Sequence, residues 1–206
     1  MVLSKWDEKY AAAPTGLFGS APNEYVRQIT ARSDFRARTA LCIADGDGRN
    51  SRFLALRGIA VTAVDLSPVG CANGEALDAA AGVSVKRIVG DVVVWQPAPA
   101  ETWDAVFVMY LQAPQAVRMA ALRCGFEALG TGGILAVEGF SKAQAGETGD
   151  GALGPGSPEL MYDLDEIHGC LPEAQIVEAF SGRVRLDQGG RHRGLAHVVR
   201  FAGRKL

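Results

Sequence analysis

The sequence has 206 residues, of which 48% are apolar and 21% charged, enough to fill one core, so a single domain is the default expectation. Its formal net charge of −2 gives no basic excess, which argues against nucleic acid as a partner. No apolar stretch approaches the roughly 20 residues that span a bilayer, and the acidic, aromatic start is unlike a secretory signal. We therefore expect a soluble protein that binds no membrane.

The cysteines are Cys42, Cys71, Cys124 and Cys170, and no two of them form a CxxC pair. Thiols inside apolar runs behave as small hydrophobic groups. This usage predicts a reducing, cytoplasmic setting and no structural metal.

The first element is an expected amino-terminal helix in which Trp6 and Tyr10 lie four residues apart, on one face. A pair at this spacing usually docks a terminal helix onto the core. Leu17 and Phe18 follow shortly after and extend the apolar surface.

Five apolar runs then alternate with helical patterns, and their apolar residues are consecutive, as in strands covered on both faces of a parallel sheet. The expected strands cover residues 39–45, 59–65, 83–91, 103–110 and 132–140. The expected helices cover residues 49–58, 67–82 and 113–130, each ending in a glycine suited to a helix carboxyl terminus. Ser67 and Pro68 are suited to start the second of these helices. The fold class is α/β.

The carboxyl-terminal third differs in pattern. Residues 139–158 are too rich in Gly and Pro for a packed element, which predicts a loop. The segments 174–188 and 194–206 read as strands joined by the turn "GGRHRG", which predicts an antiparallel hairpin.

Gly46 and Gly48 directly follow the first strand, where a sharp turn lets an anionic ligand approach the next helix. Asp65 ends the second strand nineteen positions after Gly46 and is placed to bind both hydroxyls of a ribose. The third small residue of a dinucleotide fingerprint is Ser51 here, which disfavours NAD without excluding it.

Two further acids favour S-adenosylmethionine over NAD. Asp45 precedes the glycines, where it would repel a pyrophosphate but attract an α-amino cation, although it is equally suited to cap the next helix. Asp91 ends the third strand and can accept from an adenine amine while Val92 covers the ring; strand-end aspartates also commonly form turns.

At these residues the chain resembles a known group. "ADGDGRN", "VTAVDLSPVG", the "GD" at 90–91, "WDAVFVMYLQAP" and "EALGTGGILAVEGF" are similar to the successive motifs of class I S-adenosylmethionine-dependent methyltransferases, in order within residues 36–140. Looser motifs near both ends, such as "WDEKYAAAPTGLFGSAPNEYV" and "GGRHRGLAHVVRFAGRK", resemble the small bacterial methyltransferases related to tellurite-resistance and thiopurine enzymes.

The resemblance implies a Rossmann-like seven-stranded mixed sheet in the order 3-2-1-4-5-7-6, with strand 7 antiparallel and helices on both faces. It places the cofactor across the carboxyl ends of strands 1, 2 and 4. It divides one domain into an amino-terminal helical lid region (1–35), a cofactor-binding core (36–140) and a carboxyl-terminal helix with the hairpin (159–206). It leaves Asp45 and Asp47 as alternative partners of the cofactor's amine.

The resemblance also assigns side chains around the cofactor. Arg49 would reach the carboxylate of the cofactor in a forked contact, the alternative being an exposed helix arginine. Leu66 and Met109 would line the same site, and Trp6 and Tyr10 would close over the sulfonium.

The methyl acceptor is expected near Tyr110, at the end of the fourth strand, and near Arg191, His192 and Arg193 in the hairpin turn. There the arginines would attract an anion and His192 would take a proton. The other readings are a tyrosine that only completes the strand end and a solvated turn. His168 and His197 are expected to be structural.

Methyl transfer to an anionic, weakly hydrated nucleophile needs alignment and exclusion of water more than acid–base help. The leading hypothesis is a small soft nucleophile: a thiol, sulfide, or selenium or tellurium oxyanion. The alternatives are a small-molecule O- or N-methyltransferase, a module that binds S-adenosylmethionine without turnover, and an NAD-dependent reductase. We expect a monomer or weak homodimer.

Overall fold

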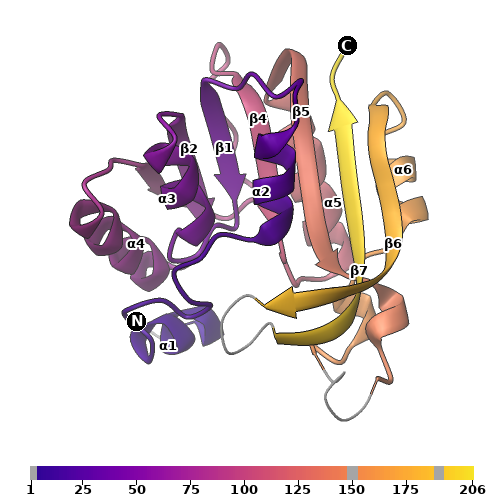
Figure 1. Cartoon of the computed structure of the whole chain (residues 1–206), viewed down its shortest axis with the longest axis horizontal. Helices are drawn as coiled ribbons and strands as arrows, with labels where there is room; N and C mark the ends of the chain where they lie inside the picture. Colours follow the sequence, from indigo (N-terminus) through magenta and orange to yellow (C-terminus); the bar gives the residue numbers. More distant parts are fainter. Residues whose placement is uncertain (1–3, 148–152, 188–192) are drawn as a thin grey trace.

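The computed structural model describes residues 4–147, 153–187 and 193–206 (Figure 1). Its helices are α1 (Lys5–Ala11), α2 (Glu24–Ala31), α3 (Arg49–Leu56), α4 (Pro68–Ala80), α5 (Gln115–Glu127), α6 (Leu164–Cys170) and the short 3-10 turns η1 (Lys142–Gln144) and η3 (Pro158–Leu160). Its strands are β1 (Thr39–Ile43), β2 (Ala60–Asp65), β3 (Lys86–Val89), β4 (Trp103–Met109), β5 (Leu129–Phe140), β6 (Gln175–Asp187) and β7 (Arg193–Arg204).

All seven strands form one sheet in the order β3-β2-β1-β4-β5-β7-β6, which confirms the predicted topology. The strands from β3 to β5 pair in parallel, whereas β7 is antiparallel to both β5 and β6. Parallel strands end at the same edge of a sheet. The polar residues that follow β1, β2 and β4 are therefore brought together.

The central strands are buried on both faces because their apolar residues are consecutive. Leu41 and Val106 face a cluster that includes residues of α5 and α6, whereas Cys42 and Phe107 face a second cluster that includes residues of α2 and α3. The alternation of successive side chains between faces requires this division. Figure 1 shows α2 in front of the sheet and α5 behind it.

The helix boundaries agree with the sequence except at α5. Ser67 caps α4 by accepting a hydrogen bond from the Gly70 N–H at 3.0 Å, and Pro68 opens the helix as expected. Gly58 and Gly82 have φ values of 79° and 69° after their helices. The expectation for Gly130 was wrong, because α5 ends at Glu127 and Gly130 already lies in β5.

The segment predicted as a loop between 139 and 158 contains regular structure in the part that the structure describes, and residues 148–152 lie outside that part. β5 continues to Phe140, and Ser141 then caps η1 and forms a bridge with Tyr162. The predicted hairpin is present as β6 and β7, and its turn at 188–192 lies outside the described residues. None of the helices in the described ranges is both long and apolar enough to cross a membrane.

Candidate active site

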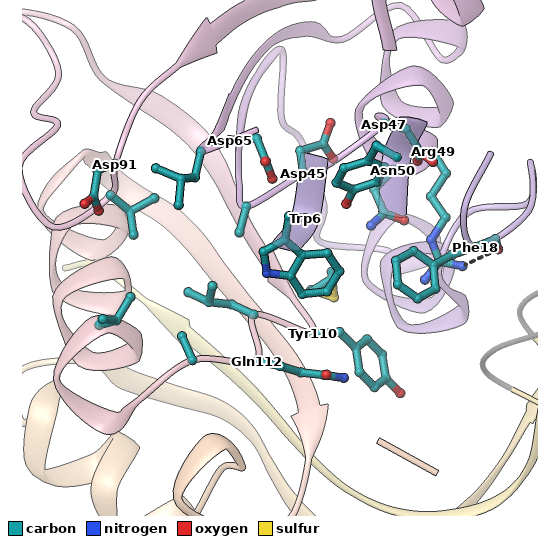
Figure 2. Close-up of a pocket in the computed structure, with 18 residues that line it drawn as sticks. Trp6, Phe18, Asp45, Asp47, Arg49, Asn50, Asp65, Asp91, Tyr110 and Gln112 are labelled. Atoms are coloured by element: carbon teal, nitrogen blue, oxygen red, sulfur yellow. Dashed lines mark hydrogen bonds between the residues drawn. The ribbon is translucent and has the colours of Figure 1, made fainter. Parts of the chain in front are cut away.

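A cavity of about 180 Å³ lies where β1, β2 and β4 end, and it is covered on one side by α1 and the segment after it (Figure 2). The predicted site residues that line it are Trp6, Tyr10, Asp45, Arg49, Asp65, Leu66, Asp91, Val92, Met109 and Tyr110. Gly46 and Gly48 lie in the turn between β1 and α3. Arg191 and His192 lie outside the described residues, and Arg193 is an exposed residue at the start of β7.

The turn after β1 contains three residues with left-handed backbone conformation. Ala44, Gly46 and Gly48 have φ values of 55°, 61° and 84°. A Cβ atom at Gly46 would lie 2.1 Å from the hydroxyl oxygen of Tyr10, so glycine is required here by the packing of α1 as well as by the backbone. At the first predicted glycine, helix α1 thus packs directly against the turn after β1.

Asp65 is held by backbone N–H groups on both carboxylate oxygens. Its Oδ2 accepts from the Gly46 N–H at 2.7 Å and its Oδ1 from the Ser67 N–H at 2.8 Å. Burial raises the pKa of Asp65 above its ordinary value, and these two bonds oppose that shift. Each oxygen has further accepting capacity, so the carboxylate can still receive two hydroxyl groups of a ribose.

Asp45 lines the cavity, and its two carboxylate oxygens differ in their hydrogen bonds. Its Oδ2 accepts from the Ser51 hydroxyl and from Arg87 Nη1 at 3.2 Å, while Oδ1 has no hydrogen-bond partner among the described residues. Burial raises its pKa to about 6, even though Arg87 and Ser51 lower it. A buried carboxylate oxygen without a partner is unfavourable unless a ligand supplies a donor.

Asp47, the alternative acid, has a partner within the chain. Its Oδ2 accepts from the Leu17 N–H at 2.7 Å, which ties the segment after α1 to the turn. Of the two acids, Asp45 is the one with a buried carboxylate oxygen, Oδ1, that has no hydrogen-bond partner among the described residues.

Arg49 is buried, with 6% exposure, so the alternative of an exposed helix arginine is wrong. Its Nη1 lies 3.5 Å from the carbonyl oxygens of Phe18 and Ala21, and its guanidinium carbon lies 5.8 Å from the Phe18 ring. Burial lowers the pKa of Arg49. Next to it, Asn50 Oδ1 accepts from the Asn23 N–H at 2.8 Å, which leaves the amide NH2 of Asn50 as the group facing the cavity (Figure 2).

Asp91 lies at one end of the cavity in Figure 2, and Val92 also lines the cavity. Asp91 Oδ1 accepts from the Val93 N–H at 2.9 Å, so it does form a turn, as the alternative reading has it. Asp91 also lines the cavity, and Val92 is buried there with 7% exposure. The pair therefore suits a flat ring with an exocyclic amine.

Helix α1 is fixed to the start of α4 through Asp7. The Asp7 carboxylate accepts from the Ser67 hydroxyl, and it also completes a capping box with Ser4. These hydrogen bonds lower the pKa of Asp7 to about 2. Trp6 and Tyr10 are thereby held over the cavity, with their ring centroids 6.1 Å apart.

Tyr110 follows β4 with a φ of 55°, a conformation that non-glycine residues rarely adopt. Its ring meets the Phe140 ring edge-on, with centroids 5.0 Å apart. Burial raises the pKa of its phenol well above the ordinary value, so at neutral pH this group is protonated.

Comparison with known proteins identifies the core of the chain. Residues 40–133, slightly less than half of the sequence, match a family described as a methyltransferase domain. These residues form a methyltransferase domain. The prediction of an S-adenosylmethionine-dependent methyltransferase is thereby confirmed, and the cofactor with it. A search of curated proteins found no match.

Solved structures of low sequence identity share the fold of this methyltransferase. The N-methyltransferase NodS from Bradyrhizobium japonicum WM9, in complex with S-adenosyl-l-homocysteine, has a TM-score of 0.72 and 14% identity, over 97% of this chain and 96% of that one. TehB from Haemophilus influenzae has a TM-score of 0.71 and 15% identity, over 98% and 68%. A structure described for the conversion of a disulfide bond into a thioacetal group during echinomycin biosynthesis has a TM-score of 0.70 and 18% identity, over 96% and 90%.

Several residues at the site of this methyltransferase could not be predicted from the sequence. Arg87 pairs with Asp45 across 42 positions, and within the run "VSVKRIVGD" it looks like an ordinary polar strand residue. Asp7 is visible only as the partner of Ser4 in a capping box, because its bond to Ser67 spans 60 positions. Asn50 is the last residue of the motif "ADGDGRN", but the orientation of its side chain depends on a hydrogen bond from the Asn23 backbone.

Proposed function

We propose that the chain transfers the methyl group of S-adenosylmethionine to a small soft nucleophile, namely a thiol, sulfide, or a selenium or tellurium oxyanion. The observation that carries the proposal is that the acids among the described residues that line the cavity lie on its cofactor side and already hold partners. Asp45 is paired with Arg87, Asp47 accepts from Leu17, and Asp65 accepts from two backbone N–H groups. An acceptor that arrives already deprotonated needs no further base.

The tyrosines of the cavity support the same proposal. Burial raises the pKa of Tyr10 and Tyr110 above the ordinary value for a phenol, so both are hydrogen-bond donors at neutral pH. Together with Phe18 and Leu111 they give the acceptor side a largely apolar lining with a few donors. Such a surface suits a polarizable, weakly hydrated nucleophile.

The residues of the cavity fit the donor as follows. Asp45 would hold the amine, Arg49 the carboxylate, Asp65 the ribose, and Asp91 with Val92 the adenine. When bound, S-adenosylmethionine supplies a sulfonium methyl group, whose carbon–sulfur bond breaks as the bond to the nucleophile forms, leaving S-adenosylhomocysteine. The chain's own contribution is to orient the two reactants and exclude water, an effect of about 7–11 kcal/mol in favourable intramolecular reactions.

The rest of the chain completes this proposal. Residues 1–35 act as a lid region, 36–140 as the cofactor-binding core, and 159–206 as a helix and hairpin beside the acceptor. Arg191, His192 and Arg193 would then attract an anionic acceptor. The protein would work in the cytoplasm as a monomer or weak homodimer and would belong to the group of small bacterial methyltransferases related to tellurite-resistance and thiopurine enzymes.

A second candidate is a small-molecule N-methyltransferase, favoured by the likeness to NodS over nearly the whole of both chains. The two candidates differ in their need for a base, because an amine must lose a proton and an acceptor that is already an anion does not. Such an enzyme would use His192 as its base, because burial raises the pKa of the Tyr110 phenol well above its ordinary value and keeps it protonated at neutral pH.

The test is methyl transfer from labelled S-adenosylmethionine to a panel of acceptors: sulfide, an aromatic thiol, selenite, tellurite, a catechol and a primary amine. We expect label in the sulfur, selenium or tellurium products. Asp65→Ala should abolish it, whereas Glu101→Gln, a change at an exposed ion pair with Lys86 far from the cavity, should not. Label confined to the oxygen or nitrogen products would overturn the soft-nucleophile proposal.

A further inference from the structure

Two glycines open a slot for the side chain of Arg87, which is only 1% exposed. A Cβ atom at Gly48 would lie 1.9 Å from Arg87 Nη2, and one at Gly74 would lie 2.6 Å from the guanidinium carbon. Gly74 lies inside α4, where glycine is unfavourable compared with alanine. Both positions are therefore explained by the room that the guanidinium needs.

The guanidinium in this slot bridges the methyltransferase cavity and α4. It donates to Asp78 Oδ2 from Nε at 2.9 Å and from Nη2 at 2.7 Å, to Ser51 Oγ at 3.1 Å, and to Asp45 Oδ2 at 3.2 Å. Asp78 also accepts from Arg52 at 3.1 Å. Two arginines and two aspartates thus balance in charge, which is how buried ions are tolerated.

Asp45 depends on this cluster because its side chain is only 1% exposed. Apart from Arg87, the titratable groups that act on it are Arg49 of α3, Asp65 at the end of β2, Cys42 of β1, Tyr10 of α1 and Cys71 of α4. Of these, Arg49 is the further cation; its Nη1 lies 3.5 Å from the carbonyl oxygens of Phe18 and Ala21, and no ion pair joins it to Asp45 among the described residues. Arg87 is therefore the cation that makes direct contact with the Asp45 carboxylate.

We propose that Arg87 is a positioning residue that holds the Asp45 carboxylate as an anion with its second oxygen, Oδ1, turned to the α-amino group of the methyl donor. This inference rests on the proposed function. It gives Gly48, the second glycine of the motif, a role toward Arg87 in addition to its role in the turn. It also makes recognition of the donor's amino-acid end separable from recognition of its adenosine.

The test compares two ligands, S-adenosylhomocysteine and 5′-methylthioadenosine, which lacks the amino-acid end, by calorimetric titration. Arg87→Met should lower the affinity for S-adenosylhomocysteine at least tenfold at pH 7 and change the affinity for methylthioadenosine less than twofold. Arg87→Lys should restore part of the loss. Lys86→Met, at the adjacent exposed position of β3, is the matched control and should change neither ligand.

Two further measurements keep the test decisive. If the single variant fails to fold, Arg87→Met combined with Asp78→Asn keeps the charges of the cluster balanced. Gly74→Ala displaces the guanidinium without removing its charge. Both variants should bind S-adenosylhomocysteine more weakly while their affinity for methylthioadenosine stays the same. In the wild type, affinity for S-adenosylhomocysteine should fall as the pH drops below about 6, and in the Arg87 variants this fall should begin at a higher pH.

The outcomes separate the two proposals. A wild type that binds neither ligand would overturn the proposed function, and this inference with it. A wild type that binds S-adenosylhomocysteine, with folded Arg87 variants that weaken both ligands equally or keep the wild-type pH profile, would overturn the role of Arg87 alone.

Discussion

The floor of the cavity and its acceptor side are built in different ways. The floor comes from strand ends within residues 44–92, where acids are fixed by backbone N–H groups or by a buried arginine. The acceptor side comes from Trp6, Phe18 and Tyr110, which belong to three separate segments and contribute mainly rings (Figure 2). The floor thus offers fixed acceptors for charged and hydroxyl groups, whereas the acceptor side offers mainly apolar surface.

The largest effect is expected at Asp65, which anchors the floor. Asp65→Ala removes a charged acceptor for two hydroxyl groups and should lower the affinity for S-adenosylhomocysteine at least about 100-fold, since each such bond contributes about 1.5–3 kcal/mol. Calorimetric titration measures this, with Asp65→Asn as the isosteric comparison. Affinity within threefold of the wild type would show that the floor does not hold the ribose there.

Asp45 should make the stability of the free protein depend on pH. Its folded pKa of about 6 exceeds the ordinary 3.8, so between these values the folded state binds more protons than the unfolded state. The free energy of unfolding should therefore fall as the pH rises from about 4 to about 6, by up to about 3 kcal/mol. Urea unfolding across this range should show a steeper fall in the wild type than in Asp45→Asn; equal slopes in both would contradict the assignment.

Trp6 tests whether the lid contributes to donor binding. Trp6→Leu keeps apolar volume but removes the ring that would face the sulfonium, a contact worth about 1–2 kcal/mol, so affinity for S-adenosylmethionine should fall roughly tenfold. Affinity for S-adenosylhomocysteine, whose sulfur is uncharged, should fall less. Lys5→Ala, at the exposed start of α1, is the control, and equal losses for both ligands would indicate simple docking of the helix.

Tyr110 tests the acceptor side directly. Tyr110→Phe removes one hydrogen-bond donor and should lower kcat/KM for the acceptor by roughly tenfold or less, about 1 kcal/mol, without changing affinity for S-adenosylhomocysteine. Steady-state kinetics with varied acceptor measures it. A matching loss of cofactor affinity would place Tyr110 on the floor instead.

The smallest effect is expected at the hairpin. The Arg193 side chain is 77% exposed and lies 3.7 Å from Asp187, a pair in solvent that contributes little. Arg193→Ala should raise the acceptor KM less than about threefold and leave stability unchanged. A larger rise at low salt than at high salt would support electrostatic attraction of an anion.

The sequence predicts the floor well because its determinants are local. Consecutive apolar residues mark β1 and β4, Ser67 and Pro68 mark the start of α4, and Asp65 stands at the end of its strand. The sheet order, by contrast, came from the resemblance to class I methyltransferases and not from periodicity.

What the sequence could not supply are pairings between distant positions. Arg87 and Asp45 meet only because β3 and β1 run parallel on either side of β2, and the buried slot that receives Arg87 exists only after α3 and α4 have packed. The misplaced end of α5 has a local cause: Gly130 is compatible with a helix end, but its backbone joins β5 instead.

The antiparallel course of β7 has a practical consequence for handling the protein. Its last residues lie at the edge of the sheet opposite the cavity, whereas the amino-terminal helix lies beside it (Figure 1). Attachment to a sensor surface through the carboxyl end would leave the ligand entrance facing the solution, and a purification tag fused ahead of α1 would sit against the entrance. Immobilised binding assays should therefore use the carboxyl end.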